Sequence, residues 1–304
     1  MHARVGLLTS LLVALAPLAC GSRTELDVPI QARSRAQLEA GTIRDAESIP
    51  DVLEVREATS HPDSIVAVCP DGGSPIAYVL DESAAFYTFD PATLTTTLVG
   101  APQCGDDTGA WDFTVSSAGA AYVIYNDWQI FKVDLTTLAC SPTSYANGQL
   151  DISGDFTASV VPTTDGREEM VFFAMPGNSS APILARSDLN AFVLTEIGDI
   201  APAPPSTTYD IKGDALGHLF GLAENGELIE VGPNDAHLEL AIATPFTTAG
   251  NWALLTLDRQ MYFFGGSSVS QYDVASRTLT PLGNVPVEVV GASAVPCLHA
   301  TSTP

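Results

Sequence analysis

A pattern that recurs five times between about residues 63 and 283 constrains this sequence most strongly. Each unit holds four short runs that alternate apolar and polar residues, which is typical of antiparallel strands joined by turns. The second run of each unit carries an aromatic residue: Tyr78, Tyr122, Phe172, Phe220 and Tyr262. These positions are 44, 50, 48 and 42 residues apart. A period of about 40 to 50 residues with four strands per unit is typical of propeller blades.

The third run of most units ends at an aspartate, and a polar turn follows. Four units share this residue, as Asp90, Asp134, Asp188 and Asp273, whereas the fourth unit has Gly232. A residue repeated at one turn of every unit is expected to be structural. A single four-stranded unit would expose both apolar faces to water, and stacking the units around an axis buries them. We therefore predict an all-β fold, a β-propeller of five four-stranded blades.

The segment Val287–Cys297 adds one more apolar run without the rest of a blade. It is expected to be an innermost strand. Two placements are open at this point: the segment begins a composite sixth blade completed from residues 25–60, or it latches onto the first unit.

Charge is distributed unevenly along the chain. The formal net charge is −24, and residues 57–304 contain 29 acidic and only six basic residues. A surface of this sign repels phosphate backbones, so we expect no nucleic-acid partner. The acidity is explained by solubility of an exported protein, with binding of a cation or a cationic partner as the alternative.

The N-terminal region has the features of an export signal. Residues 1–19 combine a short basic start with an apolar run too short to span a membrane, as in a secretory signal peptide. The sequence Leu18-Ala19-Cys20 resembles the lipobox of bacterial lipoproteins, although Pro17 stands where that motif has an aliphatic residue. The resemblance implies lipidation of Cys20, with ordinary secretion as the alternative. Residues 20–56 are then the lipidated cysteine and a flexible tether, and residues 57–304 a single propeller domain.

Assigning Cys20 to lipid leaves an even number of cysteines for an oxidising compartment. These are Cys69, Cys104, Cys140 and Cys297. Four cysteines allow three pairings. We favour Cys69 with Cys297, which would tie the ends of the ring, and Cys104 with Cys140, which would join neighbouring blades.

Carboxylates recur where the first run of several units begins, at Asp112, Asp155 and Asp210. In a propeller this strand lines the central channel, so these oxygens could converge on one rim and bind Ca²⁺. The loop with Asp106 and Asp107 is a second candidate for calcium. The alternative is that each aspartate caps a turn. No cofactor is required by the sequence.

Four aromatic residues are candidates for stacking on a sugar or peptide: Trp111, Trp128, Tyr209 and Trp252. Their alternative role is to fill the space between blades. Trp128 lies in a polar turn and is the one expected to be exposed. Catalytic motifs are missing from the sequence, since neither Gly-x-Ser-x-Gly nor His-Glu-x-x-His occurs. No residue is therefore assigned a catalytic role.

The repeats resemble those of WD40-like, NHL-like and lactonase-like propellers across about residues 60–297, and the opening Cys-Gly-Ser-Arg-Thr is similar to that of bacterial lipoproteins with β-repeat domains. The resemblance implies export to the outer membrane or cell surface, with a lipid anchor as the only membrane contact. We expect a monomeric, non-catalytic binding propeller that recognises a protein, peptide or saccharide. The alternatives are a calcium-dependent lactonase-like or glycan-cleaving enzyme, and a purely structural envelope component.

Overall fold

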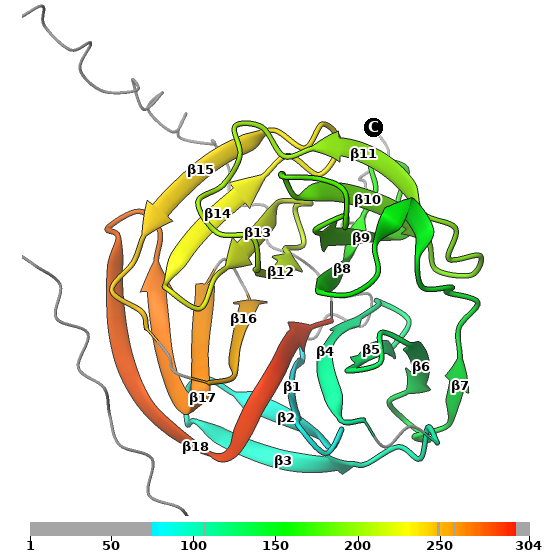
Figure 1. The fold of residues 1–304 in the computed structure, drawn as a ribbon. Helices are drawn as coiled ribbons and strands as arrows, with labels where there is room; N and C mark the ends of the chain where they lie inside the picture. The colour runs from blue at the N-terminus through cyan, green and yellow to red at the C-terminus, as the bar shows by residue number, and fades with distance from the viewer. Residues whose placement is uncertain (1–74, 106–107, 248–249, 258–259, 296–304) are drawn as a thin grey trace, which may run out of the picture. The chain divides into compact units, whose positions relative to one another are not determined.

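The computed structural model describes residues 75–105, 108–247, 250–257 and 260–295, all within the compact unit that spans Asp63–Pro304. The signal peptide, lipidation site and tether expected from the sequence lie outside the described residues. The described part is built from β-strands and one short 3-10 turn at Gln149–Asp151. None of its helical segments is long or apolar enough to cross a membrane. The prediction of an all-β propeller is confirmed, as the sheets are arranged around a common centre (Figure 1).

Three sheets correspond to the second, third and fourth sequence repeats, and each has four antiparallel strands in chain order. The first contains β4 (Ala110–Val115), β5 (Ala120–Tyr125), β6 (Ile130–Asp134) and β7 (Cys140–Pro142). The second contains β8 (Phe156–Pro162), β9 (Glu168–Ala174), β10 (Ile183–Asp188) and β11 (Thr195–Asp199). The third contains β12 (Asp210–Gly213), β13 (Leu219–Leu222), β14 (Glu227–Val231) and β15 (Leu238–Ala243).

The remaining strands form a single sheet of six, in the order β16-β17-β18-β1-β2-β3. They are β1 (Ala77–Asp81), β2 (Phe86–Asp90), β3 (Thr95–Gly100), β16 (Trp252–Leu257), β17 (Gln260–Asp273) and β18 (Thr278–Ala294). The described residues thus form four sheets, so the prediction of five separate blades, or six, is wrong. The reason is that β18 is long enough to pair with β17 through its first part and with β1 through its last part, which merges the first and fifth repeats.

The pairing of β18 with β1 settles where the last apolar run goes. Ala77 lies opposite Ala294 and Leu80 opposite Gly291, so the end of the described chain closes the ring against its beginning. Residues Ile65–Cys69, predicted as the inner strand of the first unit, lie outside the described residues. The last part of β18 occupies the inner position beside β1, which confirms the latch and not the composite sixth blade. The inner edge of the ring is formed by β4, β8, β12, β16 and this part of β18 (Figure 1).

The repeated aspartates at the ends of β2, β6, β10 and β17 all hold the turn that follows, as predicted. Asp134 Oδ1 accepts the backbone N–H groups of Thr136 and Thr137 at 2.8 and 2.9 Å. Asp188 Oδ1 accepts those of Asn190 and Ala191 at 2.9 and 2.8 Å. These bonds favour the ionised form, so they lower the pKa of both carboxyls below its usual value. The same residue type in the same place sets the same turn around the ring.

Large apolar side chains fill the spaces between neighbouring sheets. Tyr122 of β5 and Phe172 of β9, both predicted from the repeat, are buried together in one cluster. Tyr145 stacks on Phe172 with 6.0 Å between ring centroids, and it also contacts Phe156 of β8. The repeated aromatic residues therefore belong to the core that holds adjacent blades together.

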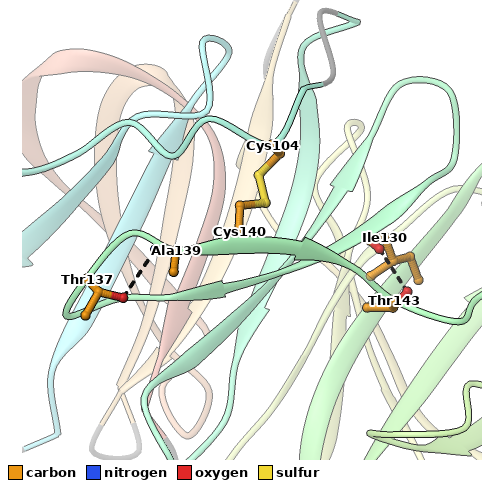
Figure 2. The surroundings of a disulfide bond; sticks show 6 residues. All are labelled: Cys104, Ile130, Thr137, Ala139, Cys140 and Thr143. Atoms are coloured by element: carbon orange, nitrogen blue, oxygen red, sulfur yellow. Dashed lines mark hydrogen bonds between the residues drawn. A yellow bond between two sulfur atoms is a disulfide. The ribbon is translucent and has the colours of Figure 1, made fainter.

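A disulfide joins the first and second sequence repeats, as the cysteine pattern predicted (Figure 2). Cys104 follows β3 and Cys140 begins β7, and their Sγ atoms are 2.04 Å apart. The bond closes a segment of 36 residues. The other expected partners, Cys69 and Cys297, lie outside the described residues, so their pairing stays a prediction.

Candidate functional site

The inner strands all begin at one end of the central channel, and a pocket of about 110 Å³ lies there. Side chains from the first residues of β4, β8, β12 and β16 line it, together with residues of adjoining turns. The lining residues are Glu82, Ala110, Trp111, Asp112, Asn126, Thr157, Thr208, Asp210, Asn251, Trp252 and Val290. We call this the mouth pocket. It brings together four of the residues predicted as candidate ligand contacts: Trp111, Asp112, Asp210 and Trp252.

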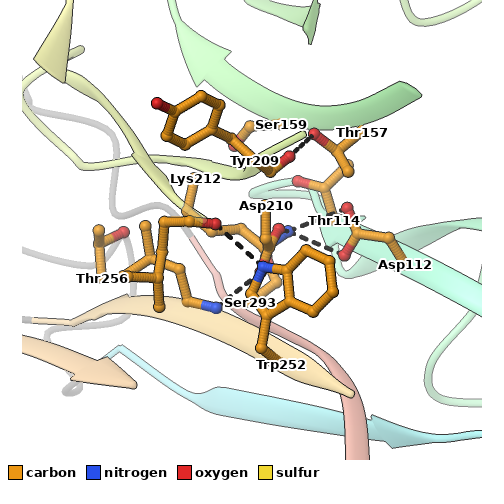
Figure 3. Close-up of polar contacts among 12 residues, drawn as sticks. Asp112, Thr114, Thr157, Ser159, Tyr209, Asp210, Lys212, Trp252, Thr256 and Ser293 are labelled. Carbon is orange, nitrogen blue, oxygen red and sulfur yellow. Dashed lines mark hydrogen bonds and ion pairs between the residues drawn. The ribbon is translucent and has the colours of Figure 1, made fainter. Parts of the chain in front are cut away.

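A buried group of three charges forms the floor of the mouth pocket (Figure 3). Lys212 Nζ lies 2.9 and 3.1 Å from the two carboxylate oxygens of Asp112 and 2.5 Å from Asp210 Oδ1. Asp210 and Lys212 are two apart on β12, so both side chains point to the same face of the strand. Asp112 belongs to β4, with β8 between the two strands, and all three residues are at most 5% exposed. Lys212 thus links two inner strands that are not neighbours.

Burial and charge shift the pKa of each member of this group. Desolvation, followed by the nearby charge of Asp210, raises the pKa of Asp112 to about 7. Desolvation also raises the pKa of Asp210. Burial alone would lower the pKa of Lys212, but the two carboxylates raise it above its usual value. Two carboxyls share one ammonium group, and Asp112 therefore binds a proton at near-neutral pH.

Hydroxyl side chains hold the inner strands beneath this floor to one another. The N–H of Val115 donates to Ser293 Oγ at 3.2 Å, and that of Val160 donates to Thr114 Oγ1 at 2.8 Å. The N–H of Gly213 donates to Ser159 Oγ at 2.7 Å. In each case a hydroxyl of one inner strand accepts from the next strand around the ring. The floor is thus held by bonds between sheets as well as within them.

Two tryptophans form the aromatic part of the pocket wall. Trp252 is fixed because its indole N–H donates to the carbonyl of Leu222 at 3.0 Å. Trp111 packs edge-on against Trp128, with 5.7 Å between the ring centroids. The indole Nε1 of Trp111 is buried and has no hydrogen-bond partner among the described residues. The wall therefore offers aromatic surface from two different inner strands.

The prediction that Trp128 is exposed is wrong. Its ring is partly buried, lies 5.6 Å from that of Phe156 by centroid distance, and packs against the same core cluster. A Cβ added at Gly154 would be only 3.0 Å from the Trp128 Nε1 atom. The polar turn residues Asn126 and Asp127 are exposed as expected, but the absence of a side chain at Gly154 lets the indole fold inward.

The other predicted site residues lie away from the pocket lining. Asp155 is exposed, with a φ of 46°, just before β8. Tyr209 is fully buried, and its hydroxyl donates to Glu227 Oε2 at 2.9 Å. Asp106 and Asp107 are outside the described residues. Within the part of the chain that the structure describes, no group of three or more His, Cys, Asp or Glu residues is placed to hold a metal ion.

Comparison with known proteins adds no family assignment. A scan against protein-family models found no match, and a search of curated proteins found none. Among solved structures, a chain of a nidogen/laminin complex matches with a TM-score of 0.47 and 10% identity, over 75% of this chain and 100% of that chain. TolB from Acinetobacter baumannii matches with a TM-score of 0.44 and 16% identity, over 75% of this chain and 56% of that chain. A protein of unknown function from Bacteroides caccae matches with a TM-score of 0.37 and 12% identity, over 69% and 73%.

Sequence reasoning missed several residues of the site, among them the polar residues Glu82, Asn126 and Lys212. The first two lie in turns, and no periodic signal marks them. Lys212 could have been found, because it is a charged residue inside the apolar run Tyr209–Gly213, in a domain with few basic residues. A lysine two positions after an aspartate on an inner strand calls for a buried partner.

Proposed function

We propose that this protein is a non-catalytic binding propeller and that its ligand occupies the mouth pocket. The observation that carries the proposal is the composition of the pocket, which is lined by Trp111 and Trp252 together with the buried carboxyls of Asp112 and Asp210. Concave sites with aromatic walls and a few converging polar groups are the usual form of ligand sites. Residues from several inner strands contribute, so the site exists only in the closed ring.

The rigidity of the surroundings supports a binding role. Each wall or floor residue is held by its own contacts: Trp252 by the carbonyl of Leu222, and the carboxyls by Lys212. A site held in this way loses little conformational entropy when a ligand enters. We propose that the ligand is part of a protein, peptide or saccharide, and that the propeller acts as a monomer.

The N-terminal sequence supports a location at the bacterial envelope. We propose that Cys20 carries the lipid anchor and that residues 21–56 tether the propeller to the outer membrane or cell surface. In this arrangement the lipid is the only membrane contact. The acidic surface then keeps the tethered domain soluble.

Arrays of glycans and of peptides test the binding proposal. The wild-type protein is compared with Trp111→Leu and with Leu98→Ala, a control that trims an exposed apolar side chain on β3. Circular dichroism and the unfolding midpoint establish that each variant is folded. We expect at least one array component to bind the wild type and the control but not Trp111→Leu. Identical profiles for all three proteins would contradict a role for the mouth pocket.

A second candidate function, a calcium-dependent lactonase-like or glycan-cleaving enzyme, is favoured by one observation. Asp112 and Asp210 meet at the floor of a pocket, and such shifted carboxyls are frequent at active sites. Its test is thermal unfolding in a chelator and then in millimolar Ca²⁺, together with hydrolysis assays of Asp112→Asn. A calcium-dependent rise in the midpoint and activity that is lost in the variant would favour the enzyme over the binding protein.

A further inference from the structure

Most side-chain hydrogen-bond donors of the mouth pocket whose partners are established bond within the protein. The Nδ2 atom of Asn126 donates to the carbonyl oxygens of Thr108 and Gly109 at 2.8 and 3.1 Å. Three more lining donors do the same: the Asn251 amide donates to Glu288 Oε1 at 3.2 Å, the Thr157 hydroxyl to the Tyr209 carbonyl at 2.7 Å and the Trp252 indole to the Leu222 carbonyl at 3.0 Å. The indole N–H of Trp111 is an exception, because it has no partner among the described residues. The oxygens of Asp112 and Asp210 already accept from Lys212, and Asp210 Oδ2 also accepts from the backbone N–H of Leu254 at 2.6 Å. An ionised carboxylate has about four acceptor positions, so these two groups and Glu82 can still accept further hydrogen bonds. The lining therefore suits a ligand that donates hydrogen bonds.

Charge points to the same kind of ligand. Three of the lining residues, Glu82, Asp112 and Asp210, are acidic, and none of the described lining residues is basic. Lys212 lies behind the floor, is 2% exposed and is shared by two carboxyls, so it neutralises only part of this charge. An acidic cleft in an acidic domain concentrates cations near its mouth.

The aromatic wall and the size of the pocket narrow the choice of cation. The faces of tryptophan rings attract an ammonium group more strongly than those of tyrosine or phenylalanine. The pocket volume of about 110 Å³ is smaller than the roughly 150 Å³ of a protein cavity that accepts benzene. A butylammonium chain of about five non-hydrogen atoms fits this space, whereas a hexose with about twelve does not enter whole.

We infer that the mouth pocket binds a protonated primary amine on a slender alkyl chain, the group carried by a lysine side chain or by a free alkylamine. The inference rests on the proposed binding function and names the chemistry of its ligand. The ammonium group lies near Asp112 and Asp210 and donates to their carboxylate oxygens, and its methylene chain passes between Trp111 and Trp252 toward solvent.

Isothermal titration of the full chain at pH 8 tests this inference with n-butylammonium and its neutral isostere 1-butanol. The ammonium is expected to bind at least about tenfold more tightly, because only it gains from the carboxylates and the ring faces. Glu82→Gln should weaken ammonium binding about two- to fivefold, and Trp111→Leu about tenfold. Glu196→Gln, which removes an exposed carboxylate from β11, is the matched control and should change the affinity less than about twofold.

The inference would be overturned by an affinity for 1-butanol equal to that for butylammonium, or by undiminished ammonium binding in both pocket variants. Absence of any heat with butylammonium up to about 100 mM would have the same effect. If methyl glycosides bind the wild type but not Trp111→Leu, and butylammonium does not bind, the inference is overturned. The proposed binding function is supported in that case. Titrations of Nα-acetyl-lysine methylamide and cadaverine distinguish the two sources, since the tighter ligand shows whether a protein-borne lysine or a free amine fits better.

Discussion

Replacing Asp112 by Asn should stabilise the protein at pH 8 and leave its stability almost unchanged at pH 4. The change removes one of two buried carboxyls that share the ammonium of Lys212, and it preserves the shape of the side chain. In the wild type the pKa of Asp112 is raised from its ordinary 3.8 to about 7. Between the ordinary pKa of 3.8 and the raised pKa of about 7, folded Asp112 holds a proton that the unfolded state has lost. The free energy of unfolding therefore falls as pH rises through this range.

The size of the effect follows from the pKa shift. Each pKa unit corresponds to about 1.4 kcal/mol, so ionising Asp112 in the folded protein costs on the order of 4 kcal/mol by pH 8. Asparagine cannot ionise and avoids this cost, but it gives up about 1 kcal/mol because its amide bonds the ammonium less well than a carboxylate. The variant should therefore be more stable than the wild type by about 3 kcal/mol at pH 8. At pH 4 both side chains are neutral, and the difference should be within about 1 kcal/mol.

Urea unfolding at five pH values from 4 to 8, followed by tryptophan fluorescence, measures this difference. Asp134→Asn is the control, because hydrogen bonds lower the pKa of that exposed carboxyl. Its effect should be nearly constant from pH 4 to 8, because the stabilisation by Asp134 is present above the ordinary pKa of 3.8 and is lost only as pH falls through the lowered one. A difference between Asp112→Asn and the wild type that stays constant from pH 4 to 8 would refute the reasoning.

Four further outcomes are expected. Lys212→Met should lower the free energy of unfolding by about 3 to 5 kcal/mol at pH 8 and by less at pH 5. The reason is that the buried carboxyls lose their counter-charge and must then bind protons. Urea titration at both pH values measures this effect. The double variant Cys104→Ser, Cys140→Ser should lose about 2 to 4 kcal/mol of stability, measured as a shift in the urea midpoint. Cys20→Ser should move the protein from the membrane to the soluble fraction of an expressing bacterium, and mass spectrometry of the wild type should find acyl chains at this residue. Affinity for butylammonium should rise from pH 5 to pH 8 as Asp112 loses its proton. The other charges near the ligand are those of Asp210, Lys212 and Glu82. Titration calorimetry at both pH values measures the affinity, and equal values would contradict this prediction.

Most of the architecture could be predicted because it depends on local sequence patterns that repeat along the chain. The repeated short runs of alternating apolar residues predicted four-stranded antiparallel units, and the second, third and fourth repeats each form such a sheet. The repeated aspartates predicted the turns, since a carboxylate that accepts nearby backbone N–H groups acts within a few residues. The Cys104–Cys140 pair followed from the parity of the cysteines and from their places in neighbouring repeats.

What the sequence did not predict depends on contacts between distant residues. The merging of the first and fifth repeats requires β18 to pair on both sides, and no periodicity within one repeat records this. The inward position of Trp128 depends on the missing side chain at Gly154. The convergence of Asp112 and Asp210 was expected, but Lys212 between them was not, although its place two residues after Asp210 on an inner strand could have marked it.

The closure of the ring by β18 and β1 has a consequence for how the chain is made. The partners Ala77 and Ala294 are more than 200 residues apart, so the six-stranded sheet cannot be completed until nearly the whole described chain has left the ribosome. Contacts of such long range form slowly. During synthesis the inner edge of β1 therefore stays unpaired by β18, which delays completion of the ring. This delay would leave time for the export that we propose to take place before the native structure forms.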